Sequence, residues 1–365
     1  MTIGFLATGD EITQGDTLNT NSQAMAHVLN SQGFILGFHL SCRDNEKDIQ
    51  TCLAFLSQMH DIIIVTGGLG PTSDDKTRFA LAKFLDIPLI ESPIALAHVK
   101  VRLDRANLEC NQGNRQQALF PDGAKLLDNP NGTAMGCYYE KDQKIYILLP
   151  GPPRECLPIF MKQLLPLLEP SKNQEGELLK WLIFGVSEGE MAERLEAALS
   201  SIDCATGYRL DMPYLEFKVR CHQADVERVR QVVMPIIDRH IIASPNKKAS
   251  EALRLALEKL QERVTIIDKV TGGVLQTLLQ RPENYQFLTF NQEEESKVSF
   301  HIAGLEDYWL NPSTKRLSTK ITISYEIQGQ RVSETDEIPF RSNLVVFYAA
   351  EWLCFRLLHL INQLH

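Results

Sequence analysis

The sequence predicts an α/β protein in three parts: a doubly wound parallel sheet, a small α+β segment and a C-terminal α/β segment. Two observations lead to this prediction. Apolar runs alternate with helical patterns over residues 1–170, as in parallel sheets with helices on both faces. A polar, linker-like stretch, Ser171–Glu177, then precedes more closely spaced strands. We therefore expect domains at residues 1–170, 178–245 and 248–365.

Strands and helices alternate in the first domain. Ile62–Val65 is an unbroken β-branched run, which suits a strand buried on both faces. Gly33 and the spacing of apolar residues set the helix boundaries before it. The elements expected besides this strand are strands Ile3–Thr8, Phe34–Leu40, Ala124–Leu127, Cys137–Tyr139 and Ile145–Leu149, helices Ser22–Gln32, Glu46–Met59 and Leu96–Leu108, a loop Asn111–Gln117, and a helix starting near Arg154 and Glu155.

The sequence after the linker predicts two smaller units. Its last helix, Asn343–Leu364, is apolar on more than one face and must therefore be buried against something. The other elements expected here are strands Trp181–Phe184, Ala205–Leu210, Tyr214–Arg220, Val264–Ile267, Val298–Ile302 and Lys320–Ile327, and helices Glu188–Leu199, Ala224–Arg239 and Lys248–Gln261.

Composition excludes several classes of protein. The 365 residues are 44% hydrophobic and 23% charged, and the net charge of −9 argues against binding to nucleic acid or to anionic membranes. The eight cysteines are scattered without a C-x-x-C pair, so neither a zinc site nor a disulfide framework is predicted. No signal peptide and no membrane span of about 20 apolar residues is evident. We expect a cytoplasmic protein.

The stretch Asp61–Thr77, DIIIVTGGLGPTSDDKT, combines a strand, a glycine-rich turn and a helix that is expected to open at Ser73–Asp75. Glycines let the backbone approach a phosphate, and N–H groups at a helix start point toward it. Neither the Walker pattern nor G-x-G-x-x-G fits this turn. A phosphate site and an ordinary turn with solvated capping aspartates therefore both remain open.

Carboxylates follow three successive strands of the predicted sheet. Asp10 and Glu11 follow the first, Asp44 the second, and Asp74 and Asp75 the third. The carboxyl ends of parallel strands meet at one edge, so these side chains are expected to gather there. A hard divalent cation bound by them would offset the charge of a phosphate ligand. The alternative is that each aspartate only caps a helix.

Five ordered motifs carry a resemblance. Over about the first 170 residues the chain is similar to the molybdopterin-binding fold domain, in the version found in the competence/damage-inducible protein CinA family, and the similarity continues into the middle segment. The motifs are Gly9-Asp10-Glu11 with Gly15 and Asn21, TGGLGPTSDDKT at Thr66–Thr77, NPNGTAMG at Asn129–Gly136, LPGPPRE at Leu149–Glu155 and FGVSEGEMAERL at Phe184–Leu195. Met135 departs from the family pattern, which has proline there.

The resemblance implies a function for the first domain. It implies hydrolysis of ADP-ribose to AMP and ribose phosphate, dependent on Mg²⁺, Mn²⁺ or Co²⁺, by a homodimer whose partner is a small nucleotide substrate. The residues it implies are Asp10, Asp74 and Asp75 as catalytic groups, Asp10, Asp44 and Asp75 as metal ligands, and Thr66, Gly67, Gly68, Gly70, Thr72, Asn129, Gly132, Thr133 and Gly151 as substrate-binding groups.

The C-terminal segment resembles the family's nicotinamide mononucleotide deamidase domain but departs from it at the nucleophile. The family's Glu-Ser-Cys-Thr-Gly-Gly motif is replaced by Asp268–Gly273, DKVTGG, which puts Lys269 where the family has its serine. A lysine cannot take over that acyl transfer without its own activation. The family's Gly-Pro-rich loop is also absent after Gly304. We predict that the deamidase activity is lost.

Three other hypotheses remain open from the sequence. The first domain could bind a nucleotide or molybdopterin without turning it over. The chain could be a bifunctional enzyme that retains the amidase activity. The C-terminal segment could serve only as a dimerisation platform.

Overall fold

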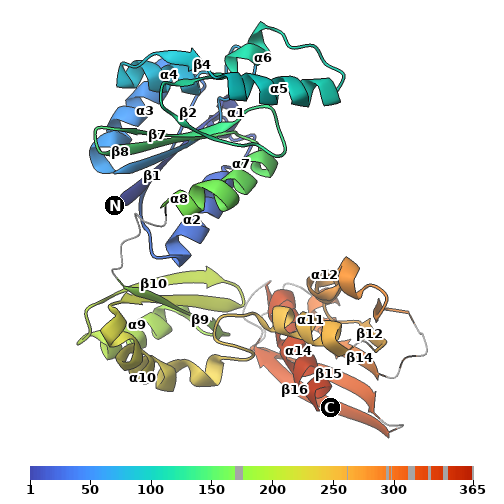
Figure 1. Ribbon diagram of the computed structural model, residues 1–365. Coiled ribbons are helices and arrows are strands. Elements are labelled where there is room, and N and C mark those ends of the chain that lie inside the picture. Colours follow the sequence, from blue (N-terminus) through green and yellow to red (C-terminus); the bar gives the residue numbers. More distant parts are fainter. Residues whose placement is uncertain are drawn as a thin grey trace. The chain divides into compact units, whose positions relative to one another are not determined.

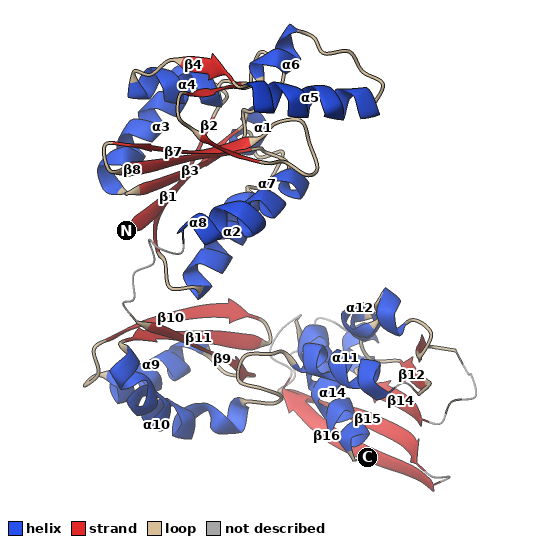
Figure 2. Cartoon of the chain, viewed as in Figure 1, coloured by secondary structure: helices blue, strands red, loops and turns tan. Residues whose placement is uncertain are grey.

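The computed structural model divides the chain into two compact units, Met1–Glu175 and Gly176–His365 (Figures 1 and 2). It describes residues 1–168, 176–260, 262–292, 296, 298–310, 317–327, 330–339 and 344–363. The predicted end of the first domain at Pro170 and most of the predicted linker, residues 171–175, lie outside the described residues.

The N-terminal unit is built on one six-stranded sheet. Its strands are β1 (Thr2–Thr8), β2 (Ile35–Cys42), β3 (Ile62–Thr66), β6 (Lys125–Leu127), β7 (Gly136–Lys141) and β8 (Lys144–Leu149). In the order β2-β1-β3-β8-β7-β6, the first four strands run parallel, β7 is antiparallel to β8, and β6 is antiparallel to β7. The carboxyl ends of four neighbouring strands therefore lie at the same edge, as predicted.

Helices cover both faces of this sheet. They are α3 (Glu46–Met59), α4 (Thr77–Leu85) and α5 (Pro93–Arg105) in one core, and α2 (Thr20–Ser31), α7 (Pro153–Ile159), a π-helical turn (Phe160–Leu164) and α8 (Leu165–Leu168) in the other. Along β3, Ile62 and Ile64 face one core while Ile63 and Val65 face the other, and all four are fully buried. The predicted double winding is confirmed.

Several local predictions in this unit were wrong. α4 begins at Thr77 and not at Ser73–Asp75, and Lys76 at its start offers no side-chain cap. The predicted loop Asn111–Gln117 contains a short helix, α6 (Gln112–Gln116), because Asn111 and Asn114 cap each other's backbone. Asp10 opens a single helical turn, α1 (Asp10–Thr13).

Further elements were shifted or missed by the sequence prediction. α5 begins three residues before the predicted Leu96, because Ser92 caps Ala95 and Pro93 fits the first turn. Four strands went unrecognised. Three of them have only three residues each, too few for a periodic pattern, and the fourth has ten residues of which seven are polar. These are β4 (Leu89–Glu91) and β5 (Leu119–Pro121), which pair with each other, and β13 (Leu288–Phe290) and β16 (Gln330–Pro339) in the second unit.

The second unit begins with a small α+β part. Its strands β9 (Glu177–Phe184), β10 (Cys204–Asp211) and β11 (Tyr214–Cys221) form an antiparallel sheet of order β10-β11-β9. Helices α9 (Glu188–Leu199) and α10 (Val226–Ile237) share one apolar core with this sheet.

The C-terminal part contains a mixed five-stranded sheet. The order is β13-β12-β14-β15-β16, in which the first three strands run parallel, β15 is antiparallel to β14, and β16 is antiparallel to β15. The remaining elements are β12 (Val264–Asp268), β14 (Val298–Gly304), β15 (Ser318–Ile327), α11 (Ala249–Leu260), α12 (Val274–Leu279), α13 (Glu306–Leu310) and α14 (Val345–Asn362).

Helix α14 is long and apolar enough to cross a membrane by length and composition, which the sequence prediction did not anticipate. Within the described residues, 56% of this stretch is buried inside the protein. Its side chains share a core with α11, α12 and the sheet. The prediction that this apolar helix is buried is confirmed.

A buried glutamate joins the two parts of the second unit. Glu351 of α14 accepts hydrogen bonds from the Tyr214 hydroxyl at 2.9 Å and from the N–H and hydroxyl of Ser250 at 3.0 and 2.6 Å. Leu182, Phe184 and Tyr214 form a small apolar cluster beside it, against which Tyr348 and Trp352 of α14 also pack. The middle and C-terminal segments therefore pack together in one unit.

A second buried acid lies on the middle sheet. Glu216 on β11 is 1% exposed and is contacted by Arg209 through two hydrogen bonds of 3.0 Å, by Lys218 at 2.9 Å and by Lys180. Burial pushes the pKa of Glu216 upward, but these three cations outweigh it and hold that pKa at about 2.

Replacing this acid should make the stability of the second unit depend differently on pH. A carboxyl whose folded pKa lies below its usual value of 4.5 stabilises the fold above that value and ceases to do so as the pH falls toward about 2. We expect Glu216→Gln to lower the free energy of unfolding by about 3 kcal/mol at pH 7. The difference should shrink steadily between pH 4.5 and pH 2. Urea unfolding followed by Trp181 fluorescence measures it.

The matched control is Glu227→Gln, whose side chain is 81% exposed. A difference between wild type and Glu216→Gln that is the same at pH 7 and pH 3 would contradict the assigned role of the three cations.

Candidate functional site

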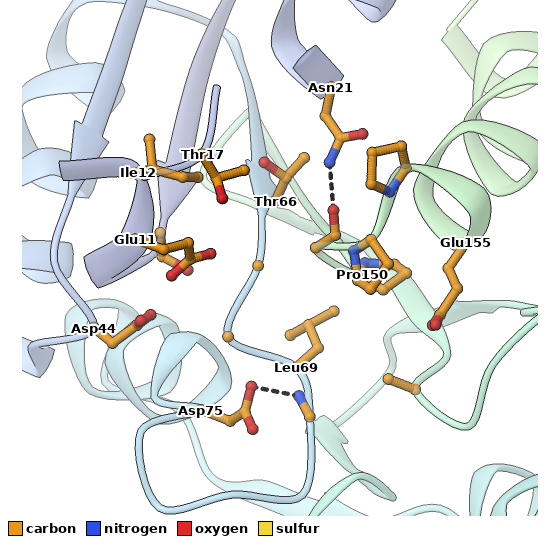
Figure 3. Close-up of a pocket in the computed structure, with 18 of the residues that line it drawn as sticks. Glu11, Ile12, Thr17, Asn21, Asp44, Thr66, Leu69, Asp75, Pro150 and Glu155 are labelled. Atoms are coloured by element: carbon orange, nitrogen blue, oxygen red, sulfur yellow. Dashed lines mark hydrogen bonds between the residues drawn. The ribbon is translucent and has the colours of Figure 1, made fainter. Parts of the chain in front are cut away.

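A cleft of about 530 Å³ lies at the carboxyl edge of the parallel strands in the N-terminal unit (Figure 3). The segments that follow β1, β2, β3 and β8 all contribute to it. The residues that line it are Thr8, Glu11, Ile12, Thr17, Leu18, Asn19, Thr20, Asn21, Asp44, Thr66, Gly67, Gly68, Leu69, Gly70, Pro71, Asp74, Asp75, Gln117, Thr133, Ala134, Pro150, Gly151, Pro152, Pro153 and Glu155.

The glycine turn after β3 forms one wall of the cleft, and its backbone needs glycine. Gly67 and Gly68 have φ angles of 99° and 64°, which residues other than glycine rarely adopt. A Cβ on Gly67 would lie 2.4 Å from the Thr8 carbonyl oxygen, and one on Gly68 would lie 2.1 Å from the Thr77 hydroxyl. Gly151 lies in ordinary contact with this turn, since a Cβ on it would be 3.5 Å from the Cα of Gly67.

The amides of this turn are only partly available to a ligand. The Gly67 N–H donates to the Leu149 carbonyl at 3.0 Å, and the Gly70 N–H donates to Asp75 at 2.6 Å. Among the residues that the structure describes, no partner is recorded for the N–H groups of Gly68 and Leu69. These two amides are therefore the donors that the turn can offer to an anion.

Asp75 fastens the turn together. One carboxylate oxygen accepts from the Gly70 N–H, and the other accepts from the Thr72 N–H at 2.8 Å and the Thr72 hydroxyl at 2.5 Å. This explains why Asp75 does not cap α4, because its acceptors are directed back into the turn. Gly70 also leaves room for this carboxylate, since a Cβ there would lie 2.5 Å from it.

Acidic side chains form the neighbouring wall. The Asp10 N–H donates to the Asp44 carboxylate at 3.1 Å, and the Asp44 N–H donates to the Asp10 carboxylate at 3.3 Å. Burial raises the pKa of Asp44, and the charges of Glu11, Asp10 and Asp74 raise it further. Negative charge is thus concentrated where β1 and β2 end.

The far side of the cleft is held by amide side chains. Asn21 donates from Nδ2 to the Gly151 carbonyl at 2.6 Å, and Gln117 donates to the Thr133 hydroxyl at 3.0 Å. Glu155, in the first turn of α7, accepts from Asn129 Nδ2 at 2.8 Å. Figure 3 shows Glu155 on one side of the glycine turn, with Glu11 and Asp44 on the other.

The structure brings most of the sequence-predicted residues to this cleft. Those that line it are Asp44, Thr66, Gly67, Gly68, Gly70, Asp74, Asp75, Thr133 and Gly151. Asp10, Thr72, Asn129 and Gly132 do not line it, although Asp10 contacts Asp44 and Thr72 contacts Asp75. In the described part of the chain, no three His, Cys, Asp or Glu residues form a metal-binding group, so Asp10, Asp44 and Asp75 are not brought together as three ligands.

Eight polar residues that line the cleft were given no site role by sequence reasoning: Thr8, Glu11, Thr17, Asn19, Thr20, Asn21, Gln117 and Glu155. Glu11, Asn21 and Glu155 fall inside the quoted motifs, so the motifs themselves could have indicated these three. No pattern in the sequence pointed to Gln117, which α6 places beside Thr133.

The segment Asp268–Gly273, which resembles the family's deamidase motif, lies at the end of β12. Lys269 is exposed there, whereas Asp268 is buried and accepts from the N–H groups of Val270 and Thr271, both at 2.9 Å. The Trp309 indole donates to the Val270 carbonyl at 2.9 Å and packs against Gly272, whose Cβ would lie 2.8 Å from the ring. The turn is therefore covered by an aromatic ring.

Comparisons with known proteins agree with the resemblance. A family described as a probable molybdopterin binding domain matches residues 4–170. A competence-damage inducible protein of Thermoanaerobacter pseudethanolicus is 32% identical over 278 residues, 74% of this chain and 67% of that protein. A protein of the same description from Alkaliphilus metalliredigens is 33% identical over 279 residues, 74% of this chain and 68% of that protein.

Solved structures match the N-terminal half. The protein CinA from Thermoplasma acidophilum is 28% identical, with a TM-score of 0.42, and the match covers 47% of this chain and 98% of that one. The molybdopterin biosynthesis enzyme MoaB from Thermus thermophilus is 20% identical, with a TM-score of 0.31 and coverage of 47% and 92%.

The geometry of the glycine turn yields a prediction with a matched control. Gly68→Ala places a Cβ against the Thr77 hydroxyl at positive φ, whereas Gly123→Ala, also at positive φ (78°), meets nothing within 4 Å. We expect Gly123→Ala to cost about 1 kcal/mol of stability and Gly68→Ala about 1–3 kcal/mol more. Hydrogen exchange of residues 66–85 measures local opening. Equal exchange in the two variants would contradict the close approach.

Proposed function

This chain belongs to the competence/damage-inducible protein CinA family, and from that premise we propose that its N-terminal cleft hydrolyses the phosphoanhydride bond of a nucleotide diphosphate. ADP-ribose, cleaved to AMP and ribose 5-phosphate, is the substrate we favour. The observation that carries the proposal is that a turn with two available amides and a wall of carboxylates face the same cleft of about 530 Å³. That volume suits a nucleotide-sized ligand.

The phosphate end of the substrate would lie at the glycine turn. The amides of Gly68 and Leu69 are donors to a phosphate oxygen, and Thr66, which is 3% exposed, lines the cleft beside them. Asp75 holds the turn in this shape before any ligand arrives. Binding there therefore requires little reordering of the backbone.

The acidic wall fits a hard divalent cation. Asp44 is surrounded by other carboxylates that raise its pKa, and no cationic side chain is recorded against it among the described residues. Mg²⁺ commonly uses only one or two protein carboxylates, together with waters and substrate phosphates, so a set of three protein ligands is not required. Asp44 and Glu11 would hold the ion, with Asp10 bonded behind Asp44. When bound, such an ion offsets phosphate charge and polarises a P–O bond.

The reaction consumes one water. Its oxygen joins one phosphorus atom while the bridging P–O bond of the diphosphate breaks, and one proton of the water passes to a base. We assign that base to Asp74, a carboxylate of the acidic wall that lines the cleft and is not assigned to the ion. Asp75, which the resemblance implied as a catalytic residue and metal ligand, is assigned the role of shaping the turn, because its carboxylate is bonded to Gly70 and Thr72.

One observation favours a second candidate function, binding without turnover. The Gly67 and Gly70 amides are already used within the protein, so the turn offers fewer donors than the sequence suggested. A nucleotide or a molybdopterin could be held by the same cleft with no reaction. The substrate assay below separates the two functions.

We further propose a cytoplasmic homodimer that acts on a small molecule and binds neither nucleic acid nor membranes. The eight cysteines are all free thiols, which suits a reducing compartment. The net charge of −9 suits the absence of polyanionic partners.

Incubation with ADP-ribose and Mg²⁺, Mn²⁺ or Co²⁺ tests the proposed hydrolysis. We expect AMP and ribose 5-phosphate in equal amounts, detected by chromatography, and loss of product when the metal is chelated. Asp44→Asn should lower kcat/KM by about 100-fold or more, because a cation ligand is removed. Asp104→Asn, an exposed acid on α5, is the control. Absence of AMP with every metal, despite tight binding of ADP-ribose, would favour the binding module.

For the C-terminal part we propose that the deamidase activity is absent. Lys269 is exposed, and Trp309 covers the turn that would hold the substrate. We expect no ammonia from nicotinamide mononucleotide above the rate with heat-denatured protein, in a coupled ammonia assay. Ammonia release by the wild type that disappears in Lys269→Ala would show that this lysine is an active nucleophile.

A further inference from the structure

Glu155 has a position in the cleft that neither the metal nor the phosphate turn explains. It lies in the first turn of α7, its side chain is 12% exposed, and it lines the cleft across the glycine turn from Glu11 and Asp44 (Figure 3). The cation nearest to it, Arg154, is 4.0 Å away and 81% exposed. A carboxylate so placed faces the ligand with its charge largely uncompensated.

Asn129 fixes one oxygen of this carboxylate. Its Nδ2 donates to Glu155 Oε2 and to the Ala134 carbonyl, both at 2.8 Å, and its Oδ1 accepts from the Asn131 N–H at 2.9 Å. Asn129 is fully buried. A flipped amide would put oxygen against two acceptors and nitrogen against a donor, so the orientation of Asn129 is determined by its surroundings.

Gly132 provides the space that this carboxylate occupies. A Cβ on Gly132 would lie 2.0 Å from Glu155 Oε2 and 2.8 Å from Asn129 Nδ2. Neither Asn129 nor Gly132 lines the cleft, although sequence reasoning had placed both among the substrate-binding residues. Both act on the cleft through Glu155.

The chemistry of an ionised carboxylate defines what it can recognise. It only accepts hydrogen bonds, so its ligand must present donors, and it repels phosphate oxygens. In ADP-ribose the hydrogen-bond donors are the ribose hydroxyls and the exocyclic amine of adenine, and of these the ribose hydroxyls are the groups that carboxylates commonly bind in nucleotide sites. The phosphates would be directed to the glycine turn and a ribose to the opposite side.

We propose that Glu155 is the ribose-recognising residue of the cleft and that Asn129 and Gly132 are its positioning residues. This inference rests on the proposed function, since it assigns the ribose end of that substrate. It makes the enzyme selective for ribose-containing diphosphates over inorganic pyrophosphate and over analogues that lack the contacted hydroxyl.

The test uses the full chain and compares ADP-ribose with two analogues, one lacking a hydroxyl on the adenosine ribose and one lacking a hydroxyl on the terminal ribose. We expect Glu155→Gln to raise KM for ADP-ribose by about tenfold, the size expected for one charged hydrogen bond, with a smaller change in kcat. One of the two analogues should show the same raised KM with the wild type and no further rise with Glu155→Gln.

Two further variants keep the proposal testable if Glu155→Gln folds poorly. Gly132→Ala displaces the carboxylate sterically and Asn129→Ala releases it, so both should reproduce the selective loss of ADP-ribose affinity. Arg154→Ala is the matched control, because its exposed side chain neighbours Glu155 without holding it. Far-ultraviolet circular dichroism confirms folding of each variant.

The outcomes separate this inference from the proposed function. An unchanged KM in Glu155→Gln, an equal loss on ADP-ribose and both analogues, or a fall in kcat alone would overturn the ribose assignment and leave the hydrolase standing. ADP-ribose that binds by calorimetry in a Glu155-dependent way, without being hydrolysed, would support the ribose assignment and overturn the hydrolase. Wild-type protein that neither binds nor hydrolyses ADP-ribose would overturn both.

Discussion

The close approach of the glycine turn after β3 to the end of β1 is the constraint on which the candidate site depends. The turn after β3 and the turn after β8 meet where Gly151 faces the backbone of Gly67. The carbonyl and hydroxyl of Thr8, at the end of β1, lie so close to Gly67 that a Cβ there would come within 2.4 and 2.8 Å of them, so the ends of three neighbouring strands meet at this point. No Cβ fits at Gly67 or Gly68, so this approach requires glycine at both positions. The acidic and amide-lined walls of the cleft then follow from which residues come next in each loop.

The sequence predicted the architecture of the N-terminal unit well because its signals are local. Apolar runs such as Ile62–Val65 specify buried strands, and their alternation with helices specifies double winding. The same reasoning was wrong at Asp75, whose side chain bonds to Gly70 and Thr72 and not to a helix start. The sequence is the same whether an aspartate before a helix caps that helix or bonds within the preceding turn. Only the conformation of the loop decides between the two roles.

The candidate site was predicted by residue type more reliably than by role. The motifs predicted Asn129 and Gly132 as substrate-binding residues, but neither lines the cleft, and both contact Glu155, which does. A sequence motif does not distinguish a buried residue that positions another side chain from a residue that binds the ligand itself. The distinction requires burial and hydrogen bonds, and neither can be read from spacing. Gln117 was missed for a different reason. It lies at the end of the short helix α6, which is too short to show a periodic pattern, and this helix brings it to the cleft.

The buried Glu351 has a consequence for how this chain could have changed in the course of its history. Its three hydrogen bonds tie the start of α11 and the middle sheet to α14, and aromatic rings of α14 cover Phe184 and Tyr214. Deleting the last 120 or so residues would strip that cover and leave an unsatisfied tyrosine on an apolar surface. A chain that lost the activity of its C-terminal part would therefore still need that part to keep the middle part covered. The presence of such a segment then reflects the dependence of the middle part's stability on it, and it gives no information about enzymatic activity.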